Sequence, residues 1–187
     1  TSSYAQAAAM AMGRAMDDVI IAAATGTAFT GETGATSTAA QTAIAAGGAG
    51  LTIAKLRTAK QTFDLASVDP SIPRHIVVGP EQITNLLSTT EVTSSDFNTV
   101  KALVQGEIDS FLGFKFTVSN RLAKSGNDRT CIAFAQDGIT LAIGKDVNAR
   151  IDERADKSYA TQVYYCQSIG ATRMEEEKVV TIQAHEA

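Results

Sequence analysis

The stretch of this sequence that comes nearest to a chemical motif is glycine-rich and reads GTAFTGET over residues 26–33. It matches the phosphate-binding pattern G-x-x-x-x-G-K-[ST] except at one position, where Glu32 stands in place of the lysine. A carboxylate there would repel the phosphates that the lysine neutralises. The stretch also follows a predicted helix, whereas the motif needs a preceding strand. We therefore expect no phosphate site here.

The groups that could act as nucleophiles, bases or paired acids are equally isolated. The two histidines, His75 and His185, lie at the start of a short strand and in the C-terminal tail. Neither G-x-S-x-G nor S-x-x-K occurs. The carboxylates of residues 17–18 and 152–153 are sequence neighbours, and neighbours point to different faces of an element, which disfavours paired acid–base chemistry. We nominate no catalytic residue and expect no enzyme activity.

The two cysteines, Cys131 and Cys166, form no C-x-x-C motif and have no histidine pair near them. This spacing argues against a zinc site, and we expect no metal and no cofactor. Both cysteines fall in apolar, strand-like runs, which favours buried small hydrophobic side chains. A disulfide between neighbouring strands is the alternative.

Charged residues gather in three places where they suit contacts between copies of the chain better than catalysis. A helix carries Arg14 and Asp18 four residues apart, where they could pair with each other. The run ARIDERADKSYATQ mixes charges of both signs along an extended segment, and the run EEEK could meet a basic patch on a neighbour. Plain surface solvation is the alternative in each place. The candidate inter-subunit contacts are Arg14, Asp17, Asp18, Arg150, Asp152, Glu153, Arg154, Glu175, Glu176 and Glu177.

Composition indicates a folded chain with a sizeable core. The sequence has 187 residues, of which 44% are hydrophobic and 19% charged, enough for one large domain or two small lobes. The net charge of -4 and the lack of a dense Lys/Arg cluster argue against sequence-specific binding or wrapping of nucleic acid. No apolar run approaches the roughly 18 residues of a membrane span, and no signal peptide is visible.

The first half of the sequence predicts helices around one short strand. Alanine and methionine favour a long helix over residues 3–24, with an apolar stripe at helical spacing. Residues 25–50 are rich in glycine and threonine and predict a loop with room for a short strand. Thr52 is a predicted N-cap for a helix from Ile53 to about Ala66. A strand over residues 75–79 and a helix from Pro80 to Leu87 follow.

The second half predicts mostly strands. Ser94 or Ser95 is expected to cap one more helix, which ends before Gly106. Beyond Gly113 a strand should place three apolar side chains, Phe114, Phe116 and Val118, on one face. The Asp137–Gly138 pair predicts a hairpin between TCIAFA and ITLAIG, and the chain from Ala149 onward alternates as extended strands do. The order of elements indicates the α+β class.

Several stretches, read in order, resemble the major capsid proteins of tailed bacteriophages. They are AMGRAMDDVIIAAATGTAFTGETG, then LRTAKQTFDLASVDPSIPRHIVVGPEQITNLLSTTEVTSSDFNTVKALVQGEIDSFLGFKFTVSNRL, then IGKDVNARIDERADKSYATQVYYCQSIGATRMEEEKVV. Each stretch alone is unspecific. Their joint occurrence in family order, through nearly the whole chain, carries the resemblance.

The resemblance implies a two-lobed fold. A peripheral lobe would contain a long spine helix and long antiparallel strands, and an axial lobe of α/β character would lie near the capsomer centre. Residues 1–50 would then be the spine helix and a loop of the peripheral lobe, residues 51–145 the axial lobe, and residues 146–187 strands returning to the peripheral lobe. The sequence begins at the spine helix, so we expect the arm and extended loop that precede it in the family to lie outside this sequence.

The function implied by the resemblance is that of a structural subunit of an icosahedral phage head. Such subunits form hexamers and pentamers that enclose DNA without sequence specificity, and they meet scaffold and portal proteins. The product would be made in the bacterial host cytoplasm, or from a prophage, and would reside in the virion. This sequence alone is expected to be monomeric or to associate weakly. The alternatives are a phage decoration or scaffold-binding protein, and a small hydrolase using Asp17 or Asp152.

Overall fold

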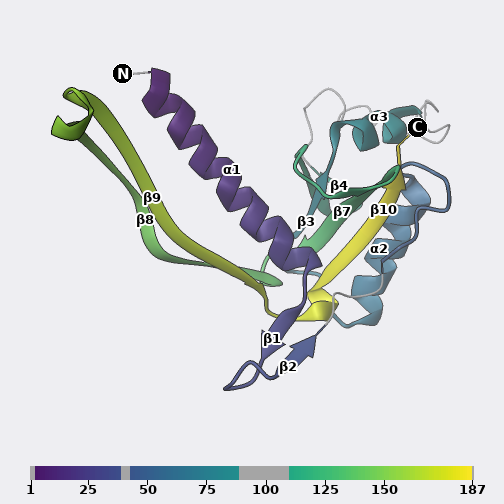
Figure 1. Ribbon diagram of the computed structural model, residues 1–187. Coiled ribbons are helices and arrows are strands. Elements are labelled where there is room, and N and C mark those ends of the chain that lie inside the picture. Colours follow the sequence, from purple (N-terminus) through teal and green to yellow (C-terminus); the bar gives the residue numbers. More distant parts are fainter. Residues whose placement is uncertain (1–2, 39–42, 89–109, 187) are drawn as a thin grey trace.

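The computed structural model describes residues 3–38, 43–88 and 110–186, and these form a mixed α+β fold (Figure 1). The helices are α1 (Ser3–Thr25), α2 (Ile53–Leu65) and α3 (Pro80–Ser88), with short 3-10 turns η1 (Ala155–Lys157) and η2 (Glu176–Lys178). The strands are β1 (Ala28–Thr30), β2 (Thr36–Thr38), β3 (Arg74–Val78), β4 (Ser110–Phe111), β5 (Phe114–Val118), β6 (Lys124–Ser125), β7 (Asp128–Ala135), β8 (Ile139–Arg154), β9 (Ala160–Arg173) and β10 (Val179–His185).

A six-stranded sheet forms the centre of the protein. Its strand order is β10–β7–β3–β5–β4, with β6 paired to β7, and the β3–β5 pair is parallel while the others are antiparallel. The helix α2 covers this sheet through a buried stripe of Ile53, Leu56, Ala59 and Phe63. The Phe63 ring lies 6.0 Å from the ring of Phe114 on β5. The core of the protein therefore lies between α2 and the central sheet.

The predicted N-cap of α2, Thr52, is confirmed. The Thr52 hydroxyl accepts a hydrogen bond from the backbone N–H of Lys55 at 3.4 Å, which satisfies one of the free donors of the first turn. The ammonium of Lys55 then donates to backbone carbonyls of Ala46, Gly50 and Gln183 at 2.8, 2.9 and 3.0 Å. Burial lowers the pKa of this ammonium. Lys55 thereby ties the loop before α2 to the last strand of the sheet.

The strand after Gly113 is confirmed, but its apolar face is buried only at one end. Phe114 is fully buried, Phe116 packs partly against the core, and Val118 is 56% exposed. The contact between Phe63 and Phe114 explains why burial is concentrated at the start of β5. Gly113 has a φ of 85°, which suits the left-handed turn between β4 and β5.

The predicted hairpin across Asp137–Gly138 is wrong. The turn exists, since the Gly138 N–H donates to the Ala135 carbonyl at 2.8 Å. The strands that flank it separate, however, because β7 pairs with β10 and β3 while β8 pairs with β9. The Gly138 carbonyl accepts from the N–H of Met174, and a Cβ at Gly138 would lie 2.8 Å from the Lys178 carbonyl. This turn is the point at which the chain passes from one sheet to the other.

The structure does not test two of the predictions made from the sequence. The helix predicted to begin at Ser94 or Ser95 lies outside the described residues. The lobe boundaries at residues 50 and 145 remain a prediction. The strand pairing shows only that β8 and β9 pair with each other, while β10 pairs with β7 of the central sheet.

A buried arginine joins α1 to the β1–β2 hairpin and to β9. Arg173, at the end of β9, is 4% exposed. Its guanidinium donates to the carbonyls of Ala24 at 3.1 Å and Gly26 at 2.9 Å, where α1 ends, and to the carbonyl of Thr38 at 2.9 Å, where β2 ends. The last carbonyls of a helix lack partners within the helix, and a cation there also suits the helix dipole. Arg173 therefore fixes the junction of α1, β1–β2 and β9.

A second buried charge, Glu186, lies directly after the last strand, β10, at one end of the central sheet. Glu186 is 4% exposed, and its carboxylate accepts from Gln82 Nε2 at 3.0 Å, from Lys124 Nζ at 2.6 Å and from the Arg129 guanidinium. The hydrogen bond from Arg129, opposed by burial and aided by Lys124 and Gln82, lowers the pKa of Glu186 to about 2. Gly79 leaves room for this cluster, because a Cβ there would lie 2.4 Å from Gln82 Oε1.

Replacing Arg173 with methionine should destabilise the junction of α1. Three carbonyl contacts are lost, and hydrogen bonds to charged groups contribute about 1.5–3 kcal/mol each, so we expect a clear drop in the urea midpoint. Limited proteolysis should also cut faster near residues 25–28. Arg173→Lys keeps the charge but loses the planar fork, so its urea midpoint should lie between those of the unchanged protein and Arg173→Met. An unchanged midpoint for Arg173→Met would contradict the assignment.

The stability of the protein should fall in acid through Glu186. Because its folded-state pKa of about 2 lies below the ordinary value of 4.5, its stabilising contribution is present above pH 4.5 and is lost as the pH falls toward 2. Urea unfolding at a series of pH values should show this loss, and Glu186→Gln should lower stability at pH 7 and flatten the dependence below pH 4.5. Equal slopes in the two proteins would show that Glu186 is not responsible.

Candidate assembly surface

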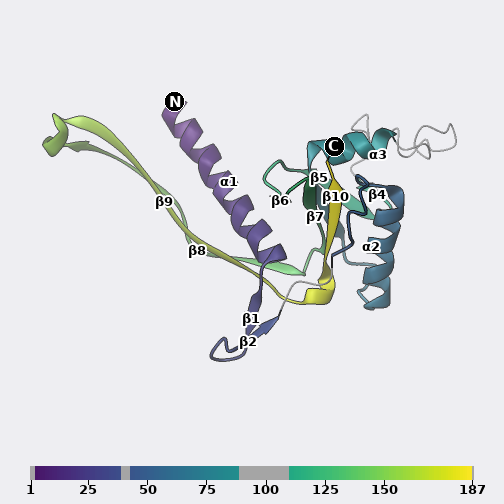
Figure 2. The same ribbon diagram turned by 45° about the vertical axis from the view of Figure 1, so that its right-hand side comes forward.

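The strands β8 and β9 form a long antiparallel hairpin that leaves the central sheet and curves away from it (Figures 1 and 2). The pairing runs from Ile139 opposite Arg173 to Arg154 opposite Ala160. Two register irregularities interrupt it on either side of Lys145. Such irregularities bend a strand and increase its twist, which accounts for the curvature.

The helix α1 lies beside the β8–β9 hairpin in both views, mainly along β9 (Figures 1 and 2). It also lies near β7 of the central sheet. The side-chain amide of Gln167 on β9 donates to the Met12 carbonyl at 3.4 Å. The predicted apolar stripe is only partly covered. Ala8, Met12, Val19 and Ala23 are half-buried, as is Met16, while Ala15 and Tyr4 are exposed. Among the described residues of α1, only Ala24 is buried.

An exposed ion pair links the C-terminal half of α1 to the loop that follows β5. The Asp18 carboxylate accepts hydrogen bonds from two nitrogens of Arg121, in the loop after β5. The hydrogen bond from Arg121 lowers the pKa of Asp18. Asp18 therefore has a partner within its own chain, and it does not pair with Arg14 as the sequence suggested it could. Arg14 and Asp17 are exposed on α1.

The register divides the predicted contact residues of β8 between two faces. Residues directly opposite in an antiparallel pair share a face, and Thr161, Val163 and Tyr165 line a cleft against α1. Glu153 lies opposite Thr161 and so belongs to the face toward α1. Arg150 and Asp152 lie on the other face, where they line a shallow polar hollow of about 380 Å³ with Tyr164 and Cys166.

The remaining predicted contacts lie at the two ends of the hairpin. Arg154 binds Asp156 near the tip, with Nε 2.9 Å from Oδ1, so this charge is also paired within the chain. Glu175 accepts from Lys178 at 3.2 Å, and Lys178 also binds Asp137 at 2.6 Å. Glu176 and Glu177 are exposed on η2. The ten predicted residues thus form no single patch, and their role between copies remains a prediction.

Sequence reasoning missed a more prominent feature, which is the number of large apolar side chains in solvent along the hairpin. Ile151 and Val163 face each other across the pair and are 67% and 41% exposed, and Tyr159 at the tip is 72% exposed. The cleft between α1 and the hairpin, lined by Tyr4, Ala8, Thr161, Val163 and Tyr165, measures about 400 Å³. Exposed apolar surface of this kind marks interaction sites. The alternation of apolar and polar residues in ARIDERADKSYATQVYY was the available signal.

The chemical candidates stay dispersed. Both cysteines are free, with Cys131 buried and Cys166 half-buried on the outer face of β9. Burial raises the pKa of the Cys131 thiol to about 11. The GTAFTGET stretch follows helix α1 and enters the β1–β2 hairpin. Within residues 3–38, 43–88 and 110–186, no cluster of three or more potential metal ligands occurs. No helix in these ranges is long and apolar enough to cross a membrane.

The comparisons with known proteins agree on the fold. A family model described as "Phage capsid protein" matches residues 1–186. No curated protein sequence matches the chain. A solved structure from Mycobacterium phage Che8 is similar, with a TM-score of 0.64 and 20% identity. The match covers 97% of this chain and 63% of that one.

Two further solved structures are similar at lower identity. The capsid of cyanophage P-SCSP1u has a TM-score of 0.65 at 14% identity, with all of this chain and 67% of that one covered. The head structure of Helicobacter pylori bacteriophage KHP40 has a TM-score of 0.64 at 12% identity, with 94% and 66% covered. The chain therefore spans about two thirds of the length of the capsid proteins that it resembles. The predicted resemblance and fold are confirmed, and the chain belongs to the phage capsid protein family.

Proposed function

We propose that this chain is a structural subunit of an icosahedral, tailed-phage head, whose copies assemble into capsomers that enclose the DNA genome. The observation that carries this proposal is the β8–β9 hairpin, which exposes Ile151, Tyr159, Val163 and Tyr164. A two-stranded hairpin is marginally stable in water on its own, and here one helix covers only part of one face. Neighbouring copies that bury these side chains would supply the missing cover.

The proposed mechanism is geometric. Closed shells form by repeating modest interfaces around symmetry axes. In this protein α1 and the β8–β9 hairpin would form the peripheral lobe, and the central sheet with α2 and α3 would form the axial lobe. This division differs from the predicted one, which put residues 146–187 in the peripheral lobe, because β10 pairs with β7 of the central sheet. Within the peripheral lobe, the junction at Arg173 ties the end of α1 and the base of the β1–β2 hairpin to the end of β9. Hexamers and pentamers of the chain are the proposed products.

The proposed setting is the virion. Scaffold and portal proteins are the proposed partners during assembly, and packaged DNA would meet the shell without sequence specificity. Family membership favours this structural role over the hydrolase alternative, and Asp17 and Asp152 lie on different elements, α1 and the outer face of β8. A decoration or scaffold-binding protein is the runner-up, and it would bind a preformed shell without assembling by itself.

Electron microscopy of the purified chain at rising concentration tests the proposal. Because this chain alone is expected to associate weakly, we expect rings or sheets only at the highest concentrations. The variant Ile151→Asp should weaken self-association by roughly tenfold or more, because a carboxylate replaces an apolar contact of more than 1.4 kcal/mol. Sedimentation velocity measures this change, and Ile151→Val, which keeps the site apolar, should associate normally.

Three results would count against the proposal. Dispersed monomers at every concentration and salt tried would contradict self-assembly. Binding to preformed shells without any self-association would favour the decoration protein instead. Equal association of Ile151→Asp and the unchanged chain would remove the hairpin as the contact surface.

A further inference from the structure

The small hairpin β1–β2 presents an aromatic side chain to solvent. Its three residue pairs run from Ala28 opposite Thr38 to Thr30 opposite Thr36, and Phe29 is 69% exposed. Gly31, at the turn, has a φ of 87°, which a residue with a side chain rarely adopts. Both views show this hairpin projecting from the body of the protein (Figures 1 and 2).

The base of this hairpin is held rigidly. A two-stranded ladder of this length would not be stable alone. The buried guanidinium of Arg173 binds the carbonyls of Gly26 and Thr38, on the two sides of the base. The fixed base leaves Phe29 at a defined place. Exposed aromatic side chains on preorganised elements are typical anchors of protein interfaces.

The tip of the hairpin is acidic. Glu32 is exposed, and residues 25–38 contain no lysine or arginine. In the described part of the chain, no ion pair engages Glu32. The hairpin therefore offers one aromatic ring and one free carboxylate to a partner.

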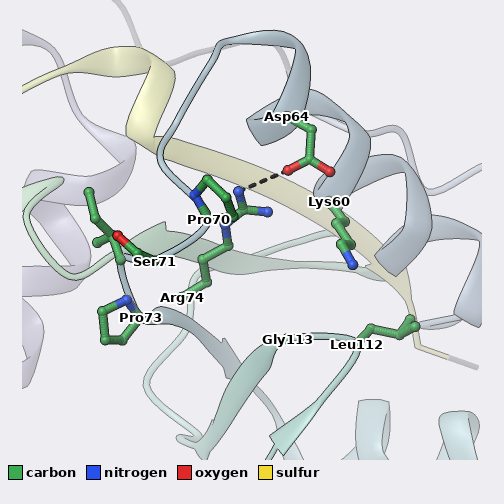
Figure 3. A pocket seen from close by; sticks show the side chains of 9 residues that line it. Lys60, Asp64, Pro70, Ser71, Pro73, Arg74, Leu112 and Gly113 are labelled. Atoms are coloured by element: carbon green, nitrogen blue, oxygen red, sulfur yellow. Dashed lines mark hydrogen bonds and ion pairs between the residues drawn. The ribbon is translucent and has the colours of Figure 1, made fainter.

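A complementary surface lies on the outer face of α2. A hollow of about 440 Å³ lies there, lined by Leu112 and by residues of α2 at helical spacing, which are Arg57, Lys60, Gln61, Asp64 and Leu65. We call these six residues the α2 groove. An adjoining hollow of about 460 Å³, shown in Figure 3, shares three of them, Lys60, Asp64 and Leu112. Leu65 is 78% exposed at the end of the helix, so the groove has an uncovered apolar part.

The charged side chains of the α2 groove that have no ion-pair partner among the described residues are cations. Asp64 is neutralised by Arg74, whose guanidinium lies 2.8 Å from its carboxylate (Figure 3). Arg57 and Lys60 are exposed, and within the described residues neither has an ion-pair partner. A ligand that fits this groove has an apolar group for Leu65 and Leu112 and a carboxylate for the two cations. The β1–β2 tip supplies both.

We propose that the β1–β2 hairpin of one copy docks in the α2 groove of a second copy, with Phe29 against Leu65 and Leu112 and Glu32 between Arg57 and Lys60. Figure 2 shows the hairpin separated from α2 within one molecule, so the proposed contact joins two copies. It is a head-to-tail contact, which closes into rings when its rotation allows. The inference rests on the proposed self-assembly and names one of its interfaces.

Site-directed disulfide crosslinking tests the contact directly. In a Cys166→Ser background, the variants Phe29→Cys and Leu65→Cys are mixed at assembly concentration and oxidised with copper phenanthroline. We expect one crosslinked dimer from the mixture, no crosslink from either variant alone, and a ladder of multimers from the chain that carries both substitutions. Phe29→Cys mixed with Val118→Cys serves as the control and should give none.

Charge exchange tests the polar half of the contact. In the mixture, Glu32→Lys on the Phe29→Cys chain should slow crosslinking about twofold to fivefold, as loss of an exposed ion pair predicts. Adding Lys60→Glu to the Leu65→Cys chain should restore the rate. If neither exchange changes the crosslinking rate, Glu32 and Lys60 do not contact each other in the interface.

The failure of this inference is distinguishable from failure of the proposed function. Normal self-association of the chain without any crosslink between positions 29 and 65 would overturn the hairpin–groove contact and leave the shell proposal standing. A chain that does not associate under any condition would overturn both.

Discussion

The guanidinium of Arg173 is the interaction on which the arrangement of the protein depends most. It sits where helix α1 ends, where the β1–β2 hairpin begins and ends, and where β9 leaves the long hairpin. These contacts join elements that are 135 to 149 residues apart in the sequence. A buried cation that binds only backbone carbonyls is insensitive to the side chains around it, so it can fix an angle between elements whose own packing is sparse.

That sparse packing is the second constraint. The central sheet and α2 bury a continuous core, in which Phe63, Phe114, Ile76 and Ile182 are completely covered. Almost all residues of β8 are exposed, and α1 has one buried residue among those described. The protein thus has one part that is stable through its own core and another that has backbone hydrogen bonds but little burial. For a subunit of a shell this division is useful, because the uncovered part gains its burial only on assembly.

The parts of the fold that could be predicted from the sequence are those whose signals are local. The Thr52 cap, the apolar spacing of α2 and Pro80 at the start of α3 each act within a few residues, and the structure confirms them. The alternation after Gly113 likewise predicts the strand β5, although only the start of its apolar face is buried. The Asp137–Gly138 turn was also predicted from local residues and it forms, but the strands on its two sides pair with other strands instead of with each other. The pairing of β7 with β10 joins residues from 45 apart (Phe134 and Val179) to 57 apart (Asp128 and His185) in the sequence, and β8 turns instead to the strand that follows it, β9.

The candidate surface was less predictable for the same reason. Charge runs suggested contacts between copies, yet Asp18 and Arg154 are paired within the chain, and Glu153 is separated from Arg150 and Asp152 by the register. The exposed apolar residues Ile151 and Val163 carry the argument instead, and their sequence pattern alone reads as that of an ordinary half-buried strand. Whether a strand face is covered by its own chain can be learned only from the tertiary structure.

The central claim is that the faces of β8 and β9 are covered by neighbouring copies in the assembled particle. Amide hydrogen exchange, followed by mass spectrometry on dispersed and assembled protein, tests it most directly. The account predicts that peptides from residues 145–168 exchange markedly more slowly in the assembled protein, while peptides from β7, already in the core, change little. Equal exchange of residues 145–168 in the dispersed and assembled protein would contradict the account.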